Sequence, residues 1–235
     1  MWVIMSPLNL IFSFHQNNNY IIMKKLFLLS FLSFFLSSSI DIYATSITQS
    51  EINVLMSGTT IEGSTGAEIT LLVYSDMECP FCIRLHNDIG LWKNIQAKYG
   101  TRVNFVYKNN RWVNHTHTEK KALTALCVKK LSGDAAYIRF YHQVLEGSID
   151  GVLYPISKIA PFIRKEKISL LRYNRCMKDP SMLAQFDKET QEAEKYNLQW
   201  TPGVIILNHK TLKYDTVEWA YPIETFKEKI DVLLK

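Results

Sequence analysis

The stretch that decides the fold runs Ile69-Thr-Leu-Leu-Val-Tyr-Ser-Asp-Met-Glu-Cys79-Pro80-Phe81-Cys82. Its first half is a run of apolar and β-branched residues, which predicts a strand buried on both faces. A segment of helical character follows, so the first sulfur is expected at a helix N-terminus, where free N–H groups and the helix dipole favour thiolate. A thiolate attacks disulfides, and a second cysteine one turn later can resolve the mixed disulfide. The pattern predicts a redox site in which Cys79 attacks and Cys82 resolves.

A structural zinc site is the alternative, because zinc sites use the same C-x-x-C spacing. Such a site needs two further ligands close by. The remaining cysteines, Cys127 and Cys176, stand alone, and the H-x-H pair His115 and His117 has no second pair at zinc-finger spacing. We therefore expect no metal and no other cofactor. The two histidines are interpreted as exposed loop residues, with metal binding, or tuning of the redox site by His115, as the alternatives.

The first 44 residues predict an export signal. The basic start Met23-Lys24-Lys25 precedes an apolar run, 26–36, and a polar segment that ends at Ala44. This is the layout of a secretory signal peptide. We expect translation to begin at Met23, with residues 1–22 as an over-extended start, and cleavage near Ala44. The alternative is an uncleaved membrane anchor, which the short apolar run disfavours.

Composition narrows the class of protein further. Removing residues 1–44 leaves 191 residues, enough for one domain with a substantial core. The net charge falls from +5 to +4, because Lys24, Lys25 and Asp41 leave together. Basic pairs such as Lys120-Lys121 and Lys129-Lys130 alternate with apolar residues at helical spacing, which is typical of a solvated helix face. Nucleic-acid binding is therefore not indicated.

The two cysteines outside the C-x-x-C motif leave two possibilities open. Four cysteines in an exported chain fit an oxidising compartment. If the motif closes on itself, Cys127 and Cys176 are the remaining pair, and a bridge between them would close a loop of about 50 residues and contribute roughly 4 kcal/mol. The other possibility is two inert buried thiols.

The order of predicted elements along the chain indicates an α/β fold. Strands are expected at 69–74, 103–107, 203–208 and 212–219, and helices at 83–99 and 223–234, with a helical block between about 118 and 196. The first two strands and the helix between them form a βαβ unit with parallel strands. Residues 45–67 are expected to be a turn-rich lead-in. This is the order of a thioredoxin fold with an inserted helical domain.

A second motif, Trp200-Thr201-Pro202-Gly203, immediately precedes the third strand. Proline is a poor residue at the head of a core strand unless it serves the fold. In thioredoxin-like proteins a proline here is cis and faces the C-x-x-C motif, and the residue before it offers its backbone to an extended substrate chain. An ordinary trans proline is the alternative, which the C-x-x-C unit upstream disfavours.

Together these motifs resemble the DsbA-like thiol–disulfide oxidoreductases of bacterial envelopes, within the thioredoxin superfamily. The matching pieces are Leu72-Val-Tyr-Ser-Asp-Met-Glu-Cys-Pro-Phe-Cys82, His115, Cys127, Cys176 and Thr201-Pro202, spread over most of residues 68–235. The resemblance implies the family's nucleophile at Cys79, its buried resolving thiol at Cys82, the cis-proline at Pro202 and its preceding residue at Thr201. It also implies a structural bridge between Cys127 and Cys176. The domain limits that follow are 45–112, an insertion at 113–185, and 186–235.

Three features depart from the strongest oxidants of that family. The dipeptide Pro80-Phe81, which is expected to tune the redox potential, has Phe where those proteins have His. Val73 stands where many relatives carry a buried Glu that transfers protons. Asp76 and Glu78 are expected to add negative charge near the sulfur, which disfavours thiolate. All three predict a less oxidising couple.

The function predicted from these features is an exported DsbA-like oxidase that exchanges its disulfide with cysteines of exported proteins. A membrane or soluble partner is expected to reset its redox state. A reductase or isomerase on the same fold is the second interpretation, since disulfide isomerases of the superfamily tend to have Thr before the cis-proline. A non-catalytic binding or chaperone protein is the third. The predicted signal peptide implies a periplasmic or otherwise exported protein. The isomerases of the superfamily dimerise through a sizeable N-terminal domain, whereas only about 24 residues separate the predicted cleavage site from the first core strand here, so we expect a monomer.

Overall fold

A computed structural model describes residues 44–111 and 115–235 of the chain. Its centre is a six-stranded sheet in the order β1-β6-β5-β3-β4-β2. The strands are β1 (Thr45–Ser46), β2 (Ile61–Gly63), β3 (Ile69–Ser75), β4 (Val103–Asn109), β5 (Gly203–Asn208) and β6 (Lys213–Glu218). Strands β3 and β4 are parallel, and β3 and β5 are antiparallel. The parallel pair with its helical crossover confirms the predicted βαβ unit.

Strand β3 lies in the middle of the sheet and is buried along its whole length. Because successive side chains of a strand point to opposite faces, Leu71 and Val73 join one apolar core while Leu72 and Tyr74 join the other. A strand with both faces covered needs a continuous apolar run rather than an alternating one. That requirement explains the run that opens the quoted stretch.

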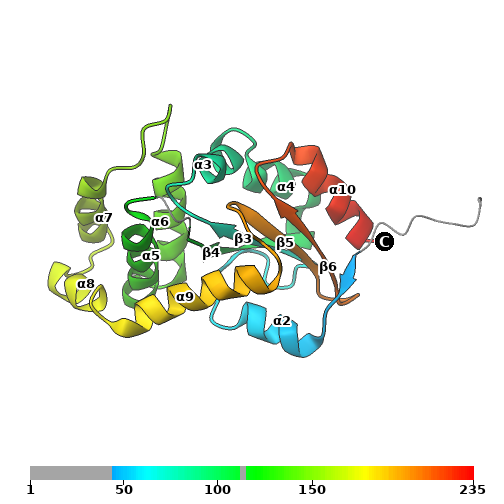
Figure 1. Cartoon of the computed structure of the whole chain (residues 1–235), viewed down its shortest axis with the longest axis horizontal. Helices are drawn as coiled ribbons and strands as arrows, with labels where there is room; N and C mark the ends of the chain where they lie inside the picture. The colour runs from blue at the N-terminus through cyan, green and yellow to red at the C-terminus, as the bar shows by residue number, and fades with distance from the viewer. Residues whose placement is uncertain (1–43, 112–114) are drawn as a thin grey trace, which may run out of the picture. The chain divides into compact units, whose positions relative to one another are not determined.

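Helices cover both faces of the sheet (Figure 1). On one face lie α4 (Leu91–Tyr99) and α10 (Ile223–Leu233), whose Ile95 and Phe226 are fully buried in the first core. On the other lie α2 (Gln49–Met56) and the C-terminal part of α9 (Pro180–Lys195). Helix α3 (Pro80–Asn87), which begins just after Cys79, follows β3 closely. This α/β architecture is the thioredoxin fold predicted from the sequence.

A helical block lies beside the β4 side of the sheet in Figure 1. It consists of α5 (Thr118–Ser132), α6 (Asp134–Glu146), α7 (Ile159–Lys165) and α8 (Leu170–Cys176), with a short 3₁₀ turn at Ile156–Lys158 before α7. Its side chains continue the first core, so the block is packed on the sheet rather than tethered to it. The predicted limit at 112/113 lies outside the described residues, and α9 runs without a break through the predicted limit at 185/186.

One predicted element was wrong. The single helix expected at 83–99 is two helices, α3 and α4, because Gly90 between them takes a left-handed conformation with φ +60°. The turn-rich lead-in 45–67 also holds three elements that were not predicted, β1, α2 and β2. Helix α2 begins at a capping box in which Thr48 and Glu51 bond each other's backbone N–H groups.

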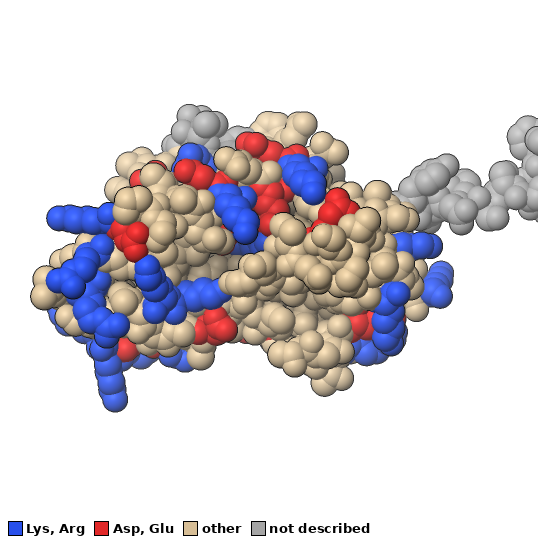
Figure 2. Space-filling view, turned by 90° about the horizontal axis from the view of Figure 1, so that it is seen from below, with Lys and Arg blue, Asp and Glu red and all other residues tan. Residues whose placement is uncertain are grey.

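Charge is spread over the surface in both signs. On the face shown in Figure 2, Lys and Arg gather mainly over the helical end, with Asp and Glu among them. Several of these form ion pairs, including Lys130 with Asp179 and Arg139 with Glu166. Among the described residues, no helix is long and apolar enough to cross a membrane. The predicted signal peptide and its start at Met23 lie outside the described residues.

Candidate active site

Cys79 caps the N-terminus of α3. Its backbone is extended (φ −71°, ψ 123°), and Pro80 occupies the first helical position, where a missing N–H costs nothing. The thiol side chains are both buried, with Cys79 5% and Cys82 2% exposed. Both are free thiols, so the structure shows the reduced form of the motif. The N–H groups of the first turn are therefore available to the Cys79 sulfur.

The Thr201-Pro202 peptide bond is cis and lies against Cys79. The Cys79 thiol donates to the Thr201 carbonyl oxygen at 3.2 Å. The sheet explains this meeting: β3 and β5 are antiparallel with Tyr74 paired to Gly203, so the end of β3 and the start of β5 share one edge. Residues 122 positions apart thus form one site.

The two thiols differ strongly in acidity. A hydrogen bond from the Cys82 thiol lowers the pKa of Cys79 to about 6, against the opposing effect of burial, and the Thr201 side chain and the N–H groups of Cys82 and Phe81 add to the lowering. Burial raises the pKa of Cys82, and the neighbouring Cys79 and Asp76 raise it further. At neutral pH the arrangement therefore holds one thiolate, on Cys79, and one thiol, on Cys82.

The carboxylates before the motif, Asp76 and Glu78, have partners of their own. Glu78 forms a buried ion pair with Lys121, 2.9 Å between Oε1 and Nζ, and accepts the backbone N–H of His117 at 2.8 Å. Asp76 is among the groups that raise the pKa of Cys82. The pKa of Cys79 is lowered although both carboxylates lie near the motif, and each carboxylate is held by other partners.

His115, in the loop before α5, was expected to be an exposed residue without a task but is partly buried against Asp76. His115 Nδ1 lies 2.8 Å from Asp76 Oδ2, and the Thr118 hydroxyl donates to the same carboxylate at 2.6 and 2.7 Å. His117 is exposed, as expected. Loop conformation determines these contacts, so residue spacing alone could not predict them.

Aromatic side chains surround the entrance to the site. Phe81 packs edge-on against Trp219 at 5.3 Å between ring centroids, and Trp200 stacks on Trp219 at 5.1 Å. Phe81, Trp200 and Tyr221 keep 43%, 39% and 49% of their surfaces exposed. An open pocket of about 390 Å³ lies between Phe81 and Tyr221. An exposed apolar surface of this kind beside a buried thiolate suits an extended peptide with a cysteine.

Comparison with known proteins places the chain in a family. A thioredoxin family model matches residues 56–231, about three quarters of the chain. The chain belongs to the thioredoxin family.

Solved structures share the fold of this thioredoxin-family chain. BdbD from Bacillus subtilis in its oxidised form superposes with a TM-score of 0.65 at 18% identity, over 82% of this chain and 98% of BdbD. Wolbachia pipientis alpha-DsbA1 superposes with a TM-score of 0.63 at 18% identity, over 77% of this chain and 94% of alpha-DsbA1. Pseudomonas aeruginosa DsbA2 superposes with a TM-score of 0.60 at 20% identity, over 74% of this chain and 93% of DsbA2. A comparison with curated protein sequences finds no match. At such identities the likeness establishes the fold.

Behind Cys82 the thioredoxin-fold core contains a small cavity of about 20 Å³. Val73, Ser75 and Tyr141 line it together with Cys82. Val73 is 4% exposed and presents only methyl groups. A carboxylate at position 73 would lie beside the buried Cys82 thiol and could exchange a proton with it. The apolar side chain of Val73 cannot do so.

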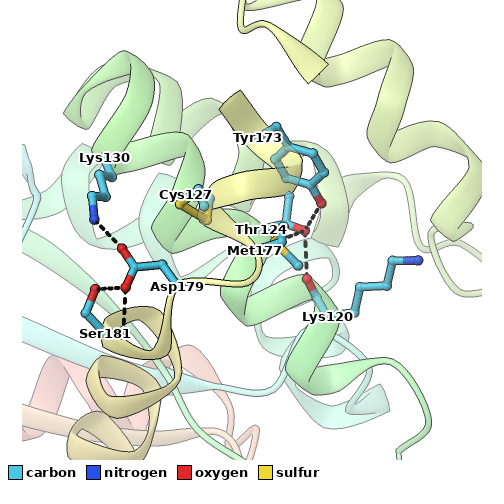
Figure 3. Close-up of a disulfide and its surroundings, with 9 residues drawn as sticks. Lys120, Thr124, Cys127, Lys130, Tyr173, Met177, Asp179 and Ser181 are labelled. Carbon is cyan, nitrogen blue, oxygen red and sulfur yellow. Dashed lines mark hydrogen bonds and ion pairs between the residues drawn. A yellow bond between two sulfur atoms is a disulfide. The ribbon is translucent and has the colours of Figure 1, made fainter. Parts of the chain in front are cut away.

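The remaining cysteines lie in the helical block, where Cys127 of α5 and Cys176 of α8 form a disulfide (Figure 3). The Thr124 hydroxyl bonds the Tyr173 hydroxyl at 2.8 Å beside it, so a polar contact ties the same two helices. Lys130 pairs with Asp179 just beyond the bridge. The bridge and these contacts link α5 to α8 and to the start of α9.

Proposed function

We propose that this chain is an exported thiol–disulfide oxidoreductase, a DsbA-like oxidase that passes its Cys79–Cys82 disulfide to cysteines of exported proteins. One observation carries the proposal: the Cys79 sulfur lies at a helix N-terminus, 3.2 Å from the carbonyl before a cis-proline, with its pKa lowered to about 6. A thiolate that stable is a good leaving group. An inert binding protein would gain nothing from this arrangement.

The proposed reaction transfers two electrons from the client to the motif. A client thiolate attacks Cys79 Sγ of the oxidised motif, an S–S bond forms between them, and Cys82 leaves as a thiolate that takes a proton. A second client thiolate then attacks the client sulfur of the mixed disulfide and releases Cys79 as a thiolate. The client gains a disulfide and the motif becomes the dithiol. A membrane or soluble redox partner then accepts the two electrons and restores the disulfide.

Thr201 and Pro202 position the client in this scheme. The segment before β5 carries Trp200 and lies beside Trp219, whose backbone N–H donates to the Pro202 carbonyl oxygen at 2.9 Å, and Phe81 packs on the same Trp219 ring. An extended client segment can add to that backbone as a strand while its cysteine reaches Cys79. Main-chain bonding of this kind tolerates many client sequences.

Reduction or isomerisation of disulfides is the second candidate, and Thr201 before Pro202 favours it together with the uncharged Phe81. The same site would then work from the dithiol form, with the Cys79 thiolate attacking a client disulfide.

The cellular compartment, the periplasm or another exported location, is also part of the proposal. It rests on the predicted signal segment and on the shared fold of a thioredoxin-like protein of Salmonella enterica serovar Typhimurium that is described as periplasmic.

Single-cysteine variants test the proposal. The oxidised protein is mixed with a reduced peptide that carries two cysteines, and peptide oxidation is followed by mass spectrometry. We expect oxidation by the wild type, none by Cys79→Ser, and accumulation of a mixed disulfide at Cys79 in Cys82→Ser when an oxidised peptide is supplied. Exchange that survives in Cys79→Ser, or a folded wild type without exchange, would overturn the proposal.

The direction of electron flow needs a separate measurement. The redox state of the motif in cells is read by trapping free thiols with a mass-shifting maleimide. An oxidase is kept mainly as the Cys79–Cys82 disulfide, whereas a reductase or isomerase is kept as the dithiol.

A further inference from the structure

Two histidines meet between the active-site helix and the helical block. His86 lies on α3 and His142 on α6, with 3.2 Å between His86 Nε2 and His142 Nδ1. Their side chains are only 12% and 18% exposed. His86 is seven residues after Cys79, about 10 Å along the helix axis. The pair is therefore well separated from the attacking sulfur, although His86 is one helical turn after Cys82 and lines the small cavity behind that thiol.

The Glu62 carboxylate fixes the orientation of the His142 ring. Its Nε2 lies 2.8 and 3.0 Å from the two oxygens of Glu62 on β2. Glu62 also accepts the Tyr107 hydroxyl at 2.7 Å. A neutral His142 donates Nε2–H to this carboxylate and directs the Nδ1 lone pair towards His86. A histidine that donates one ring N–H to a carboxylate and presents its other ring nitrogen to the ion is the arrangement of metal-binding histidines.

A carboxylate completes a set of three donors. Glu146 is one helical turn after His142 on α6, and its Oε1 lies 3.9 Å from His86 Nε2. The ligand atoms of His86, His142 and Glu146 all lie within 4.8 Å of one another. Among the residues that the structure describes, these are the ones that bring three such donors together.

The spacing of the donors fits a tetrahedral ion. Two nitrogens at about 2.05 Å from a tetrahedral zinc are about 3.3 Å apart, and the two histidine nitrogens are 3.2 Å apart. Glu146 is 56% exposed on its helix, so a rotamer change can bring its oxygen to the same point. Two nitrogens and one oxygen are donors that suit zinc, and their number leaves a fourth position open to solvent.

We propose that His86, His142 and Glu146 form a zinc site, with Glu62 as the carboxylate that orients His142. The ion joins α3 to α6 and so fixes the active-site helix to the helical block. This proposal is independent of the proposed redox function, because none of its ligands takes part in disulfide exchange.

Zinc titration of the oxidised protein tests the site. With Cys79 and Cys82 closed as a disulfide, the thiols cannot bind the metal, and affinity is measured by competition with a chromogenic zinc indicator. We expect one zinc per chain. His142→Gln should weaken binding at least 100-fold, and Glu62→Gln about 10- to 100-fold. The matched control His117→Gln, which removes an exposed histidine from the H-x-H pair, should leave the affinity unchanged.

A spectroscopic measurement keeps the test independent of the variants' folding. Cobalt(II) added to oxidised wild type should give the visible bands of a four- or five-coordinate ion without sulfur-to-metal charge transfer, and zinc should abolish them. Zinc should also raise the melting temperature of wild type and of His117→Gln. No zinc bound by the folded wild type up to 1 mM, or binding that His142→Gln and His86→Gln leave intact, would show that the two rings form only a structural hydrogen bond.

Discussion

The Cys79 sulfur receives its stabilisation from groups that the chain brings together from two places. The first turn of α3 supplies the N–H groups and the Cys82 thiol, and the segment before β5 supplies Thr201. Only the first set is local in sequence. The position of the nucleophile could therefore be predicted from the C-x-x-C motif, and the contact with Thr201 only through the resemblance to a known fold.

Phe81 is the residue we expect to moderate the oxidising power. Its side chain packs on Trp219 and brings neither charge nor a donor to the sulfur. Phe81→His should stabilise the thiolate with a polar, partly cationic ring, lower the pKa of Cys79 and raise the reduction potential by tens of millivolts, where ~30 mV corresponds to tenfold in the equilibrium constant. Glutathione equilibria of both proteins measure this shift.

Phe81→Leu is the matched control, because it removes the ring without adding a donor. Its potential should stay close to that of the wild type. A potential for Phe81→His that is unchanged or lower would mean that Val73 or the Thr201-Pro202 segment sets the potential instead.

The side chains that hold Asp76 and Glu78 could not be predicted from the sequence. They are Lys121 and Thr118 of α5 and His115 of the loop before it. Sequence spacing predicted two negative charges near the sulfur but gave no sign of the groups that pair with them. Ion pairs between distant segments depend on how the segments pack, and composition does not encode that.

At the scale of elements, Gly90 separates α3 from α4. Its φ of +60° is left-handed, and an added Cβ would lie 3.2 Å from Asn94 Nδ2. Gly90→Ala should therefore destabilise the fold by about 1–2 kcal/mol. Urea unfolding measures the change.

Gly66→Ala is the comparison for this substitution, since Gly66 has no positive φ and no atom within 4 Å of an added Cβ. Gly66→Ala should change the free energy of unfolding by no more than about 0.5 kcal/mol. Equal stability of the two variants would show that the left-handed turn is not what ends α3.

The same turn explains why one helix was predicted where two exist. Apolar residues recur at helical spacing through 83–99, and a lone glycine does not by itself reveal a left-handed backbone. Helix α2, in contrast, carried a signal: Thr48 and Glu51 have the spacing of a capping box. The central strands could be predicted because burial on both faces demands long apolar runs.

At the scale of the whole molecule, the bridge between Cys127 and Cys176 is predicted to be structural. Its cysteines are separated by 49 positions, so replacing both by Ala should lower the free energy of unfolding by roughly 2–4 kcal/mol. Peptide oxidation by Cys79 should be largely unchanged, because the bridge ties α5 to α8, away from the site. Unfolding curves and exchange rates of the double variant check both parts, and unaltered stability would contradict the structural role.

The lowered pKa of Cys79 also makes stability depend on pH and redox state. A thiol with a folded pKa of about 6 and an unfolded pKa of about 8.5 stabilises the reduced fold fully above the unfolded value, and this contribution is lost as pH falls through 6. The oxidised motif has no such group. The stability of reduced relative to oxidised protein should therefore rise between pH 6 and 8.5.

Denaturant unfolding of both redox forms at pH 5.5, 7 and 8.5 measures this difference. The stability of Cys79→Ser, which cannot form the disulfide, should show no such rise relative to the oxidised wild type. A reduced form that loses stability relative to the oxidised form across this window would mean that the pKa of Cys79 is raised by the fold.

The account rests on Cys79 as a stabilised thiolate, and its alkylation rate against pH tests this most directly. Reduced protein is treated briefly with iodoacetamide at a series of pH values, and the modified cysteine is identified by mass spectrometry. The structure predicts modification at Cys79 with a midpoint near pH 6, while Cys82 stays unmodified. A midpoint at or above the ordinary thiol value of about 8.5, or faster modification of Cys82, would contradict it.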